Sequence, residues 1–273
     1  MYVLIVILML LGFSLFLLVG LNFLVNDWQV KEKKDGLSLK KSHRLLAILA
    51  HPDDEVVIAG TLAKLKAKGS DIHLLYATHG EDGPTGGIVS QDKLGKTRLK
   101  ELQEAAAILK ADSLEVLNYP DRCLNQLAKS EFKNKLTEKI HEIRPDLIIC
   151  FDDRIGLYGN EDHLYTGRLA QETAKENSHI VTDLLIMTLS KPMLKAALRF
   201  SRTFKERYDP QKGLPDANLA IRISPYGTLK KKVIQAHKTQ NEVMNDVQPL
   251  WDKIPAAIYY RILSKEYFHH IKL

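Results

Sequence analysis

From about residue 43 onward, apolar and polar positions follow two alternating patterns. Short apolar runs predict buried strands, and apolar positions spaced three or four apart predict helices between them. The expected strands cover 44–50, 71–78, 113–119, 144–151 and 180–189, and the expected helices cover 54–68, 96–110, 131–143 and 163–175. Strand and helix alternating in this way predict an α/β fold with a Rossmann-like, mostly parallel sheet and helices on both faces. We expect this domain to span 43–240, followed by a helical tail at 241–273 that packs on it.

The chain begins differently, because residues 1–25 carry no charged side chain. As a helix they would extend roughly 37 Å, and the hydrocarbon core of a bilayer is roughly 30 Å thick. This predicts one transmembrane helix at 1–25 that anchors the protein in a membrane. A cleaved secretory signal is the alternative, but a basic leading region and a small-x-small cleavage site before Asn26 are both missing.

Basic residues dominate the expected linker at 26–42 and its border with the domain. They are Lys31, Lys33, Lys34, Lys40, Lys41 and Arg44. Positive charge beside a membrane span favours the cytoplasmic side. The sequence therefore predicts a single-pass membrane protein whose domain lies on the cytoplasmic face.

Cysteine content and charge pattern argue against a disulfide-stabilised protein and against a nucleic-acid-binding protein. Two cysteines, Cys123 and Cys150, give no disulfide framework and suit a reducing compartment. The formal net charge is +6, but beyond the linker the basic residues are spread along the chain without aromatic interleaving or a nucleic-acid motif. We therefore expect no nucleic-acid partner, and no obligate protein partner is evident.

The densest chemistry lies in A-H-P-D-D-E, residues 50–55, at the end of the first expected strand. In a parallel sheet, ligands bind beyond the carboxyl ends of the strands. Acidic residues at a helix start are ordinary caps, which is the simplest interpretation of Asp53, Asp54 and Glu55. Capping, however, does not require His51 before Pro52 or a second aspartate, so we favour a cation site.

A metal site can be assembled from this turn and one later loop. His51 and Asp54 can place a nitrogen and an oxygen on one zinc ion, which accepts both ligand types. The loop after the strand at 144–151 offers His163 as a third ligand, although a lone histidine is more often structural. Asp53 is then free to act as general base. Another divalent transition metal is possible, whereas a magnesium phosphohydrolase suits a histidine-rich ligand set less well.

These residues resemble the LmbE/PIG-L-type metal-dependent de-N-acetylases, which remove acetyl groups from N-acetylglucosamine-containing molecules. The resemblance covers roughly 43–240, and A-H-P-D-D-E is its most specific motif. Supporting matches follow in order: THGEDG at 78–83, TRLKELQEAAAIL at 97–109, YPD at 119–121 and AHKTQ at 236–240. Several ordered matches are more specific than any one of them.

The resemblance also implies roles for single residues. It implies zinc ligation by His51, Asp54 and His163, with Asp53 as the catalytic base. It further implies substrate binding by Arg98, Asp121 and His237. Without the resemblance, the last three would be read as a solvated helix residue, a turn residue after a proline and a helix-surface histidine.

One position departs from the family pattern. Asn160 in N-E-D-H stands where the family usually has a histidine that assists the carbonyl oxygen. An amide can donate to a developing oxyanion but carries no positive charge, and a lost donor costs roughly 3 kcal/mol, or about a hundredfold in rate. His79 is a candidate to supply the missing imidazole.

Two classes of function therefore remain open. The first is a membrane-anchored zinc hydrolase that deacetylates an N-acetylated amino-sugar conjugate, for which a glycolipid is one candidate. The second is a non-catalytic, metal-dependent sugar-binding or interaction protein derived from such an enzyme. Asp53 favours the enzyme, because binding alone does not require a general base.

Overall fold

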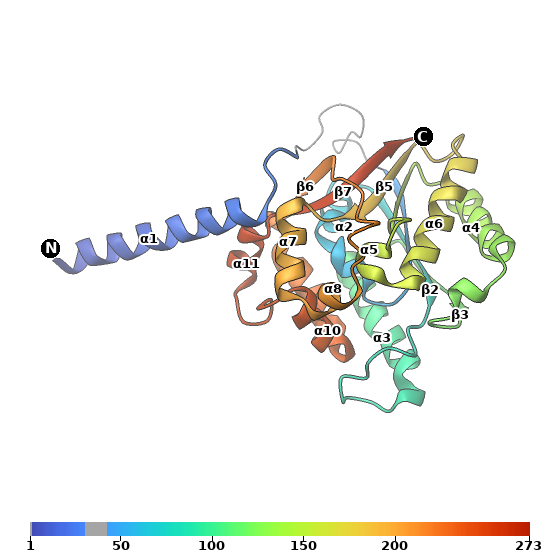
Figure 1. Cartoon of the computed structure of the whole chain (residues 1–273), viewed down its shortest axis with the longest axis horizontal. Coiled ribbons are helices and arrows are strands. Elements are labelled where there is room, and N and C mark those ends of the chain that lie inside the picture. The colour runs from blue at the N-terminus through green and yellow to red at the C-terminus, as the bar shows by residue number, and fades with distance from the viewer. Residues whose placement is uncertain (1, 31–42) are drawn as a thin grey trace.

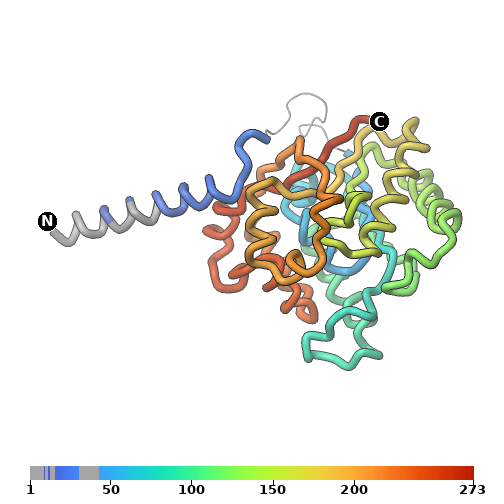
Figure 2. Tube along the Cα trace, in the orientation of Figure 1, coloured from blue at the N-terminus to red at the C-terminus, as the bar shows by residue number. Residues whose placement is uncertain are grey.

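The computed structural model describes residues 2–30 and 43–273, apart from the side chains of 2–8, 10, 11 and 13–15. Helix α1 (Tyr2–Val25) projects from a rounded body that contains all the other elements (Figure 1). The tube in Figure 2 follows the same path and ends with the C-terminal segment lying across this body. The functional site must therefore be sought in the body, where the sheet lies.

Within the described residues, the body is built on a seven-stranded sheet with the order β3-β2-β1-β4-β5-β7-β6. The strands are β1 (Arg44–Leu49), β2 (Asp71–Thr78), β3 (Ser113–Tyr119), β4 (Leu147–Cys150), β5 (Asp183–Thr188), β6 (Leu219–Arg222) and β7 (Lys265–Lys272). The helices are α2 (Ala59–Lys66), α3 (Gln91–Leu109), α4 (Lys129–Ile143), α5 (Gly156–Gly159), α6 (Glu161–Glu176), α7 (Lys191–Phe200), α8 (Arg202–Arg207), α9 (Gly227–Ala236), α10 (Asn241–Val247) and α11 (Ala256–Ile262). Short 3₁₀ turns are η1 (Asp54–Val57), η2 (Leu124–Gln126), η3 (Ser224–Tyr226) and η4 (Lys238–Gln240).

Strands β1 to β5 run parallel, whereas β7 pairs antiparallel with both β5 and β6. The prediction of an α/β fold with a mostly parallel sheet is confirmed. Strand β1 lies between β2 and β4, with Leu45 opposite both Ile72 and Leu147. The strand order therefore reverses beside β1, and a crevice opens at such a point beyond the carboxyl ends of the strands.

Alternate side chains of β1 enter two separate cores, as the period of two along a strand requires. Leu45 and Leu49 belong to the core that α2, α3 and α9 cover, and Leu46 and Ile48 belong to the core under α4 and α6. All four side chains are almost completely buried. Helices thus cover both faces of the sheet, which holds the ends of β1 and β4 rigidly in place.

The C-terminal segment differs from the helical tail expected at 241–273. Its first part forms α10 and α11, but residues 265–272 form β7, which inserts between β5 and β6. Tyr267 and Phe268 are buried there, and aromatic side chains favour a packed sheet surface. The segment therefore completes the sheet of the domain, and no boundary at 240 separates it.

The membrane predictions are wrong: in the described part of the chain, no helix has the length and apolar character that crossing a membrane requires. This finding overturns two predictions, that residues 1–25 form a transmembrane helix and that the protein is a single-pass membrane protein. The end of α1 contacts protein, because Asn22 donates to the carbonyls of Arg261 (2.6 Å) and Ile262 (3.0 Å), and Asn26 donates to that of Ile262 (2.6 Å). The basic residues at 31–41, on which the expected orientation depended, lie outside the described residues.

Candidate metal centre and active site

The turn after β1 has an unusual backbone. Asp53 has a φ of 109°, in a region that residues with a side chain rarely adopt. The Asp54 carboxylate closes the turn by accepting the backbone N–H groups of Ala50 (2.9 Å) and His51 (2.7 Å). The expected continuous helix at 54–68 is instead η1 followed by α2, because Ile58 has non-helical angles between them. Such strain persists only where neighbours hold it, which is typical of functional sites.

The three residues predicted as metal ligands lie together at this turn. His163 lies in the first turn of α6, and its Nε2 is 3.1 Å from Nδ1 of His51 and 3.1 Å from Oδ1 of Asp54. His51 Nδ1 is 3.8 Å from Oδ2 of Asp54, and all three residues are buried. Ligands of one tetrahedral zinc ion, with bonds of about 2.0–2.1 Å, are roughly 3.3 Å apart.

The chemistry of these donors also fits a cation. Two imidazole nitrogens and a carboxylate oxygen face one another in a buried space, where their lone pairs repel unless a proton or a metal ion lies between them. The ring of Phe151 stacks on His163 with centroids 3.9 Å apart, which fixes the direction of Nε2. The triad is therefore suited to a divalent metal ion.

The other nitrogen of His51 is held by two carboxylates. Nε2 lies 3.1 Å from Oδ1 of Asp121 and 3.2 Å from Oδ2 of Asp162, so it carries the proton and leaves Nδ1 free for a cation. Burial alone lowers the pKa of His51, but the hydrogen bonds with these carboxylates raise it to about 10, so a cation that binds Nδ1 must displace a proton from it. Burial would raise the pKa of Asp121, whereas the same contact lowers it to about 2. The sequence analysis missed Asp162, although its position directly before a candidate ligand was a usable signal.

His51, Asp121 and Asp162 form a second group whose atoms could hold an ion. Their carboxylates are already hydrogen-bonded, because Asp121 accepts the N–H of Asp82 (2.9 Å) and Asp162 accepts that of Arg122 (2.7 Å). We therefore interpret this group as the support of His51. Asp121, expected to bind substrate, lines the pocket, but its carboxylate is already bonded to His51.

Asp53 is paired with Arg98, the second residue expected to bind substrate. Arg98 is buried and donates to Oδ1 of Asp53 (3.0 Å), to the carbonyl of Gly80 (2.9 Å) and to that of Pro52. Burial raises the pKa of Asp53 to about 7, even though the Arg98 guanidinium lowers it. A carboxyl group with a pKa near neutrality is suited to taking up and returning protons.

His237, the third expected substrate residue, is fully buried and does not line the pocket. Its Nε2 pairs with Oε1 of Glu55, whose other oxygen accepts Tyr76 Oη–H (2.8 Å) and the N–H of Asp53 (3.2 Å). Burial would raise the pKa of Glu55, but the charge of His237 lowers it. This buried pair supports the strained turn from below, a role that the sequence motif did not reveal.

Asn160 begins α6 and presents His163. Its Oδ1 accepts the N–H groups of Asp162 (2.9 Å) and His163 (3.2 Å), and its side chain also hydrogen-bonds Tyr158. Asparagine is among the preferred residues at a helix N-cap. His79 does not replace the missing histidine in this pocket, because it bonds Asn118 and is absent from the lining.

A polar cavity of about 500 Å³ lies at the carboxyl ends of β1 and β4. Its lining includes His51, Asp53, Asp54, Arg98, Asp121, Asn160 and Asp162, but not His163. Arg122, Thr203, Arg207 and Gln240 complete its rim. No ion pair involving either rim arginine occurs among the described residues. A cation site and a carboxylate of near-neutral pKa in one polar cavity can hydrolyse a polarised carbonyl compound.

Comparison with known proteins gives both family and fold. The family described as "PIG-L: GlcNAc-PI de-N-acetylase" matches residues 46–174. A 1D-myo-inositol 2-acetamido-2-deoxy-alpha-D-glucopyranoside deacetylase of Saccharomonospora viridis is 30% identical over 234 residues, which cover 74% of this chain and 87% of that protein. A diacetylchitobiose deacetylase of Thermococcus kodakarensis is 27% identical over 231 residues, covering 81% and 79%.

Solved structures share the fold at lower identity. The N,N'-diacetylchitobiose deacetylase of Pyrococcus horikoshii, complexed with its inhibitor MPG, has a TM-score of 0.64 at 23% identity and covers 88% of each chain. The 4-carboxy-2-hydroxymuconate hydratase GalB of Pseudomonas putida has a TM-score of 0.60 at 18% identity, covering 85% of this chain and 96% of that one. Since a hydratase shares the architecture, the reaction must be argued from the site.

Proposed function

This chain belongs to the GlcNAc-PI de-N-acetylase (PIG-L) family, and from this premise we propose that it is a zinc-dependent amide hydrolase. Its substrate is an N-acetylglucosamine-containing conjugate from which it removes the acetyl group. The observation that carries the proposal is the convergence of His51 Nδ1, Asp54 and His163 Nε2 beside the carboxylate of Asp53. Two nitrogen donors and one carboxylate suit zinc and leave a coordination position for substrate.

The bound cation would polarise the acetyl carbonyl and make water more acidic. Asp53 then takes the proton of the attacking water and returns it to the departing amine, which restores the carboxylate for the next turnover. Arg98 holds Asp53 in the required direction through its bond to Oδ1. Asp121 and Asp162 keep the proton of His51 on Nε2.

The substrate-binding roles are reassigned in this proposal. Arg98, Asp121 and His237 support other side chains, so we expect the polar rim to contact the sugar. Within the described residues, Arg122 and Arg207 of this rim form no ion pair. Asn160 serves mainly as the cap of α6, and its neutral amide supplies the carbonyl oxygen with no positive charge. We therefore expect slower turnover than a histidine at this position would allow.

The test uses purified full-length protein loaded with zinc and a panel of N-acetylglucosaminides, with free amine as the readout. Asp53→Asn should lower turnover by about 10²–10⁴-fold while zinc content stays constant. Asp92→Asn, on the exposed first turn of α3, is the matched control and should behave as wild type. Wild-type protein that binds zinc but releases no amine from any member of the panel would favour the non-catalytic sugar-binding alternative.

A further inference from the structure

A chain of hydrogen bonds joins helix α3 to the wall of the catalytic pocket. Glu101 is buried on α3, one turn after Arg98. Its Oε1 accepts the backbone N–H of Thr239 (2.9 Å), and its Oε2 accepts the hydroxyl of the same residue (2.6 Å). The carboxylate thus holds the short turn η4 against α3. This contact places the last residue of the turn, Gln240, in the wall of the pocket.

The amide of Gln240 has a fixed orientation. The residue is only 1% exposed, and its Nε2 donates to the carbonyl of Pro84 (2.9 Å) and to Oγ1 of Thr239 (3.0 Å). A carbonyl can only accept, and the Thr239 hydroxyl gives its own hydrogen to Glu101, so both partners require a donor. The nitrogen and the oxygen of this amide therefore cannot exchange places.

The amide oxygen of Gln240 is left as an acceptor. Within the described residues no donor bonds to Oε1, yet this atom is not enclosed, in contrast to the unpartnered Nε of Arg98. Because the nitrogen is turned to Pro84 and Thr239, Oε1 is the polar atom of Gln240 that a ligand in the pocket can reach. A nearly buried acceptor without a partner favours a ligand that brings a donor.

The segment that holds Gln240 lies on the Asp53 side of the pocket. Pro84, which accepts the amide N–H, follows Gly83, where an added Cβ would lie only 2.6 Å from Nη1 of Arg98. Arg98 in turn holds the general base, Asp53. Because Asp53 and Gln240 line one cavity of about 500 Å³, a sugar that reacts at Asp53 occupies the space that Gln240 faces.

The chemistry of an N-acetylglucosamine unit limits what can bond to Oε1 of Gln240. The acetyl carbonyl is itself an acceptor, so an amide oxygen cannot bind it. The amide nitrogen of the substrate is the leaving group, to which Asp53 returns its proton under the proposed function. The ring hydroxyls remain as donors.

We propose that Oε1 of Gln240 accepts a hydrogen bond from a ring hydroxyl of the amino sugar and selects substrates in which this hydroxyl is free. This inference rests on the proposed function for the sugar and adds a residue that determines specificity. An alkyl or acyl group on the hydroxyl removes the hydrogen that Oε1 needs. A sugar substituted at that position is therefore rejected.

The experiment measures kcat/KM of zinc-loaded, full-length wild type for methyl N-acetylglucosaminide and for its 3-, 4- and 6-deoxy and deoxyfluoro analogues. One deoxy analogue should lose at least about tenfold, because the missing hydroxyl leaves the acceptor of the site unpaired. The deoxyfluoro analogue at the same position should lose as much, since fluorine donates no hydrogen bond. Equal kcat/KM for the parent and all analogues overturns the inference and leaves the proposed function intact.

A substitution tests whether Gln240 reads this hydroxyl. Gln240→Met keeps the length of the side chain but removes the acceptor, so the sensitive deoxy analogue should react about as well as the parent. Gln235→Met, at an exposed position of α9, is the matched control and should keep the discrimination. A loss by the same factor for every analogue in Gln240→Met would show that Gln240 only holds Pro84 and would overturn the inference.

The fluorinated sugars keep the inference testable if Gln240→Met does not fold. A loss in wild type that fluorine repairs would show that the protein donates to this hydroxyl, as an arginine does, and would overturn the inference. A loss that fluorine does not repair supports an acceptor in the protein.

A binding measurement separates the two proposals if no sugar is hydrolysed. Calorimetric titration of wild type, Gln240→Met and Gln235→Met with methyl N-acetylglucosaminide and the same analogues reports the contact without the reaction. An affinity at least about tenfold lower for one deoxy analogue, with no such loss in Gln240→Met, supports the contact even where the deacetylase proposal fails. Equal affinity of wild type for all the sugars, or no binding of the parent sugar, overturns the inference.

Discussion

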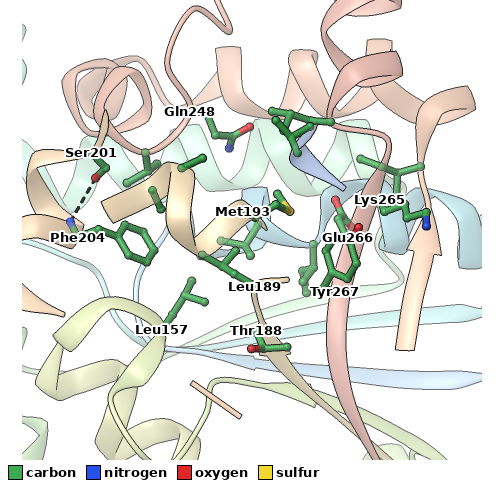
Figure 3. Close-up of a pocket in the computed structure, with 18 of the residues that line it drawn as sticks. Leu157, Thr188, Leu189, Met193, Ser201, Phe204, Gln248, Lys265, Glu266 and Tyr267 are labelled. Carbon is green, nitrogen blue, oxygen red and sulfur yellow. Dashed lines mark hydrogen bonds between the residues drawn. The ribbon is translucent and has the colours of Figure 1, made fainter. Parts of the chain in front are cut away.

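The catalytic pocket and an apolar cavity of about 220 Å³ share the lining residue Tyr158 but are built on opposite physical principles. Figure 3 shows the apolar cavity. In the catalytic pocket, charged groups fix one another: Asp121 and Asp162 hold His51, and Arg98 holds Asp53, each at about hydrogen-bond distance. In the apolar cavity, α7 contributes side chains that no hydrogen bond orients. Function that depends on a hydrogen-bonded network is sensitive to the position of single atoms, whereas an apolar wall is sensitive to the volume of its side chains. A single substitution in the catalytic pocket should therefore lower activity strongly, whereas the effect of one in the apolar wall should scale with the change in side-chain volume.

The largest effect is expected from loss of a metal ligand. His163→Ala should reduce bound zinc by elemental analysis and lower deacetylation by more than about a thousandfold, because the polarising cation is worth several kcal/mol. His141→Ala, at an exposed position of α4, is the matched control. Full zinc content in folded His163→Ala protein would contradict the ligand assignment.

A smaller effect is expected from the groups behind the ligands. Asp121→Asn and Asp162→Asn each keep the size of the side chain but weaken the hold on Nε2 of His51. Each should cost about 10–100-fold in zinc affinity or turnover, which is typical of groups that orient a metal-bound histidine. Zinc titration with a competing chelator measures the affinity. Unchanged affinity and turnover in both variants would mean that His51 is oriented by packing alone.

The contrast between the cavities also explains how much the sequence predicted. The strand pattern located β1 to β5. His51 and Asp54 follow the end of β1 directly, and His163 lies in the first turn of α6 beyond β4, so order and residue type were enough to predict them as ligands. The supporting role of Arg98 could not, because its contacts with Gly80 and Pro52 join segments far apart in the chain.

The apolar cavity was beyond the reach of sequence patterns for a related reason. Its wall combines α7 and α8, for which the sequence analysis predicted no helix, with β7, which was expected to be helical. A strand that returns antiparallel between β5 and β6 depends on long-range pairing, and local propensity does not encode this. The long-range hydrogen bonds of Asn22 and Asn26 with the end of α11 could not be predicted for the same reason.

A third prediction concerns stability at Asn160. Asn160→Ala removes the acceptor of two N–H groups at the start of α6 and should lower the free energy of unfolding by about 0.5–2 kcal/mol. Asn160→Asp keeps an acceptor at a helix N-terminus, where negative charge is favourable, and should restore most of the loss. Urea unfolding of the metal-free proteins measures both. Equal stability of wild type and Asn160→Ala would show that the cap contributes nothing to the stability of the fold.

The smallest effect concerns α8, the helix that separates the cavities. Asp246 caps it from α10 by accepting the N–H groups of Arg202 (2.6 Å) and Thr203 (3.0 Å) and the hydroxyl of Ser201 (2.7 Å). Burial would raise the pKa of Asp246, but the hydrogen bonds, led by the Thr203 N–H, hold it below the usual value of 3.8. The folded state therefore binds this proton less readily than the unfolded chain does.

A lowered carboxyl pKa makes the folded state more stable at neutral pH than at acid pH. Its contribution is complete above the pKa of the unfolded chain, near 3.8, and disappears as the pH falls through the lower pKa of the folded state. Asp246→Asn should thus unfold at lower urea than wild type at pH 7, and the two midpoints should approach each other as the pH falls below 3.8. A difference between the two urea midpoints that stays constant down to pH 2 would mean that the carboxylate charge contributes nothing to stability and that packing alone holds α8 in place.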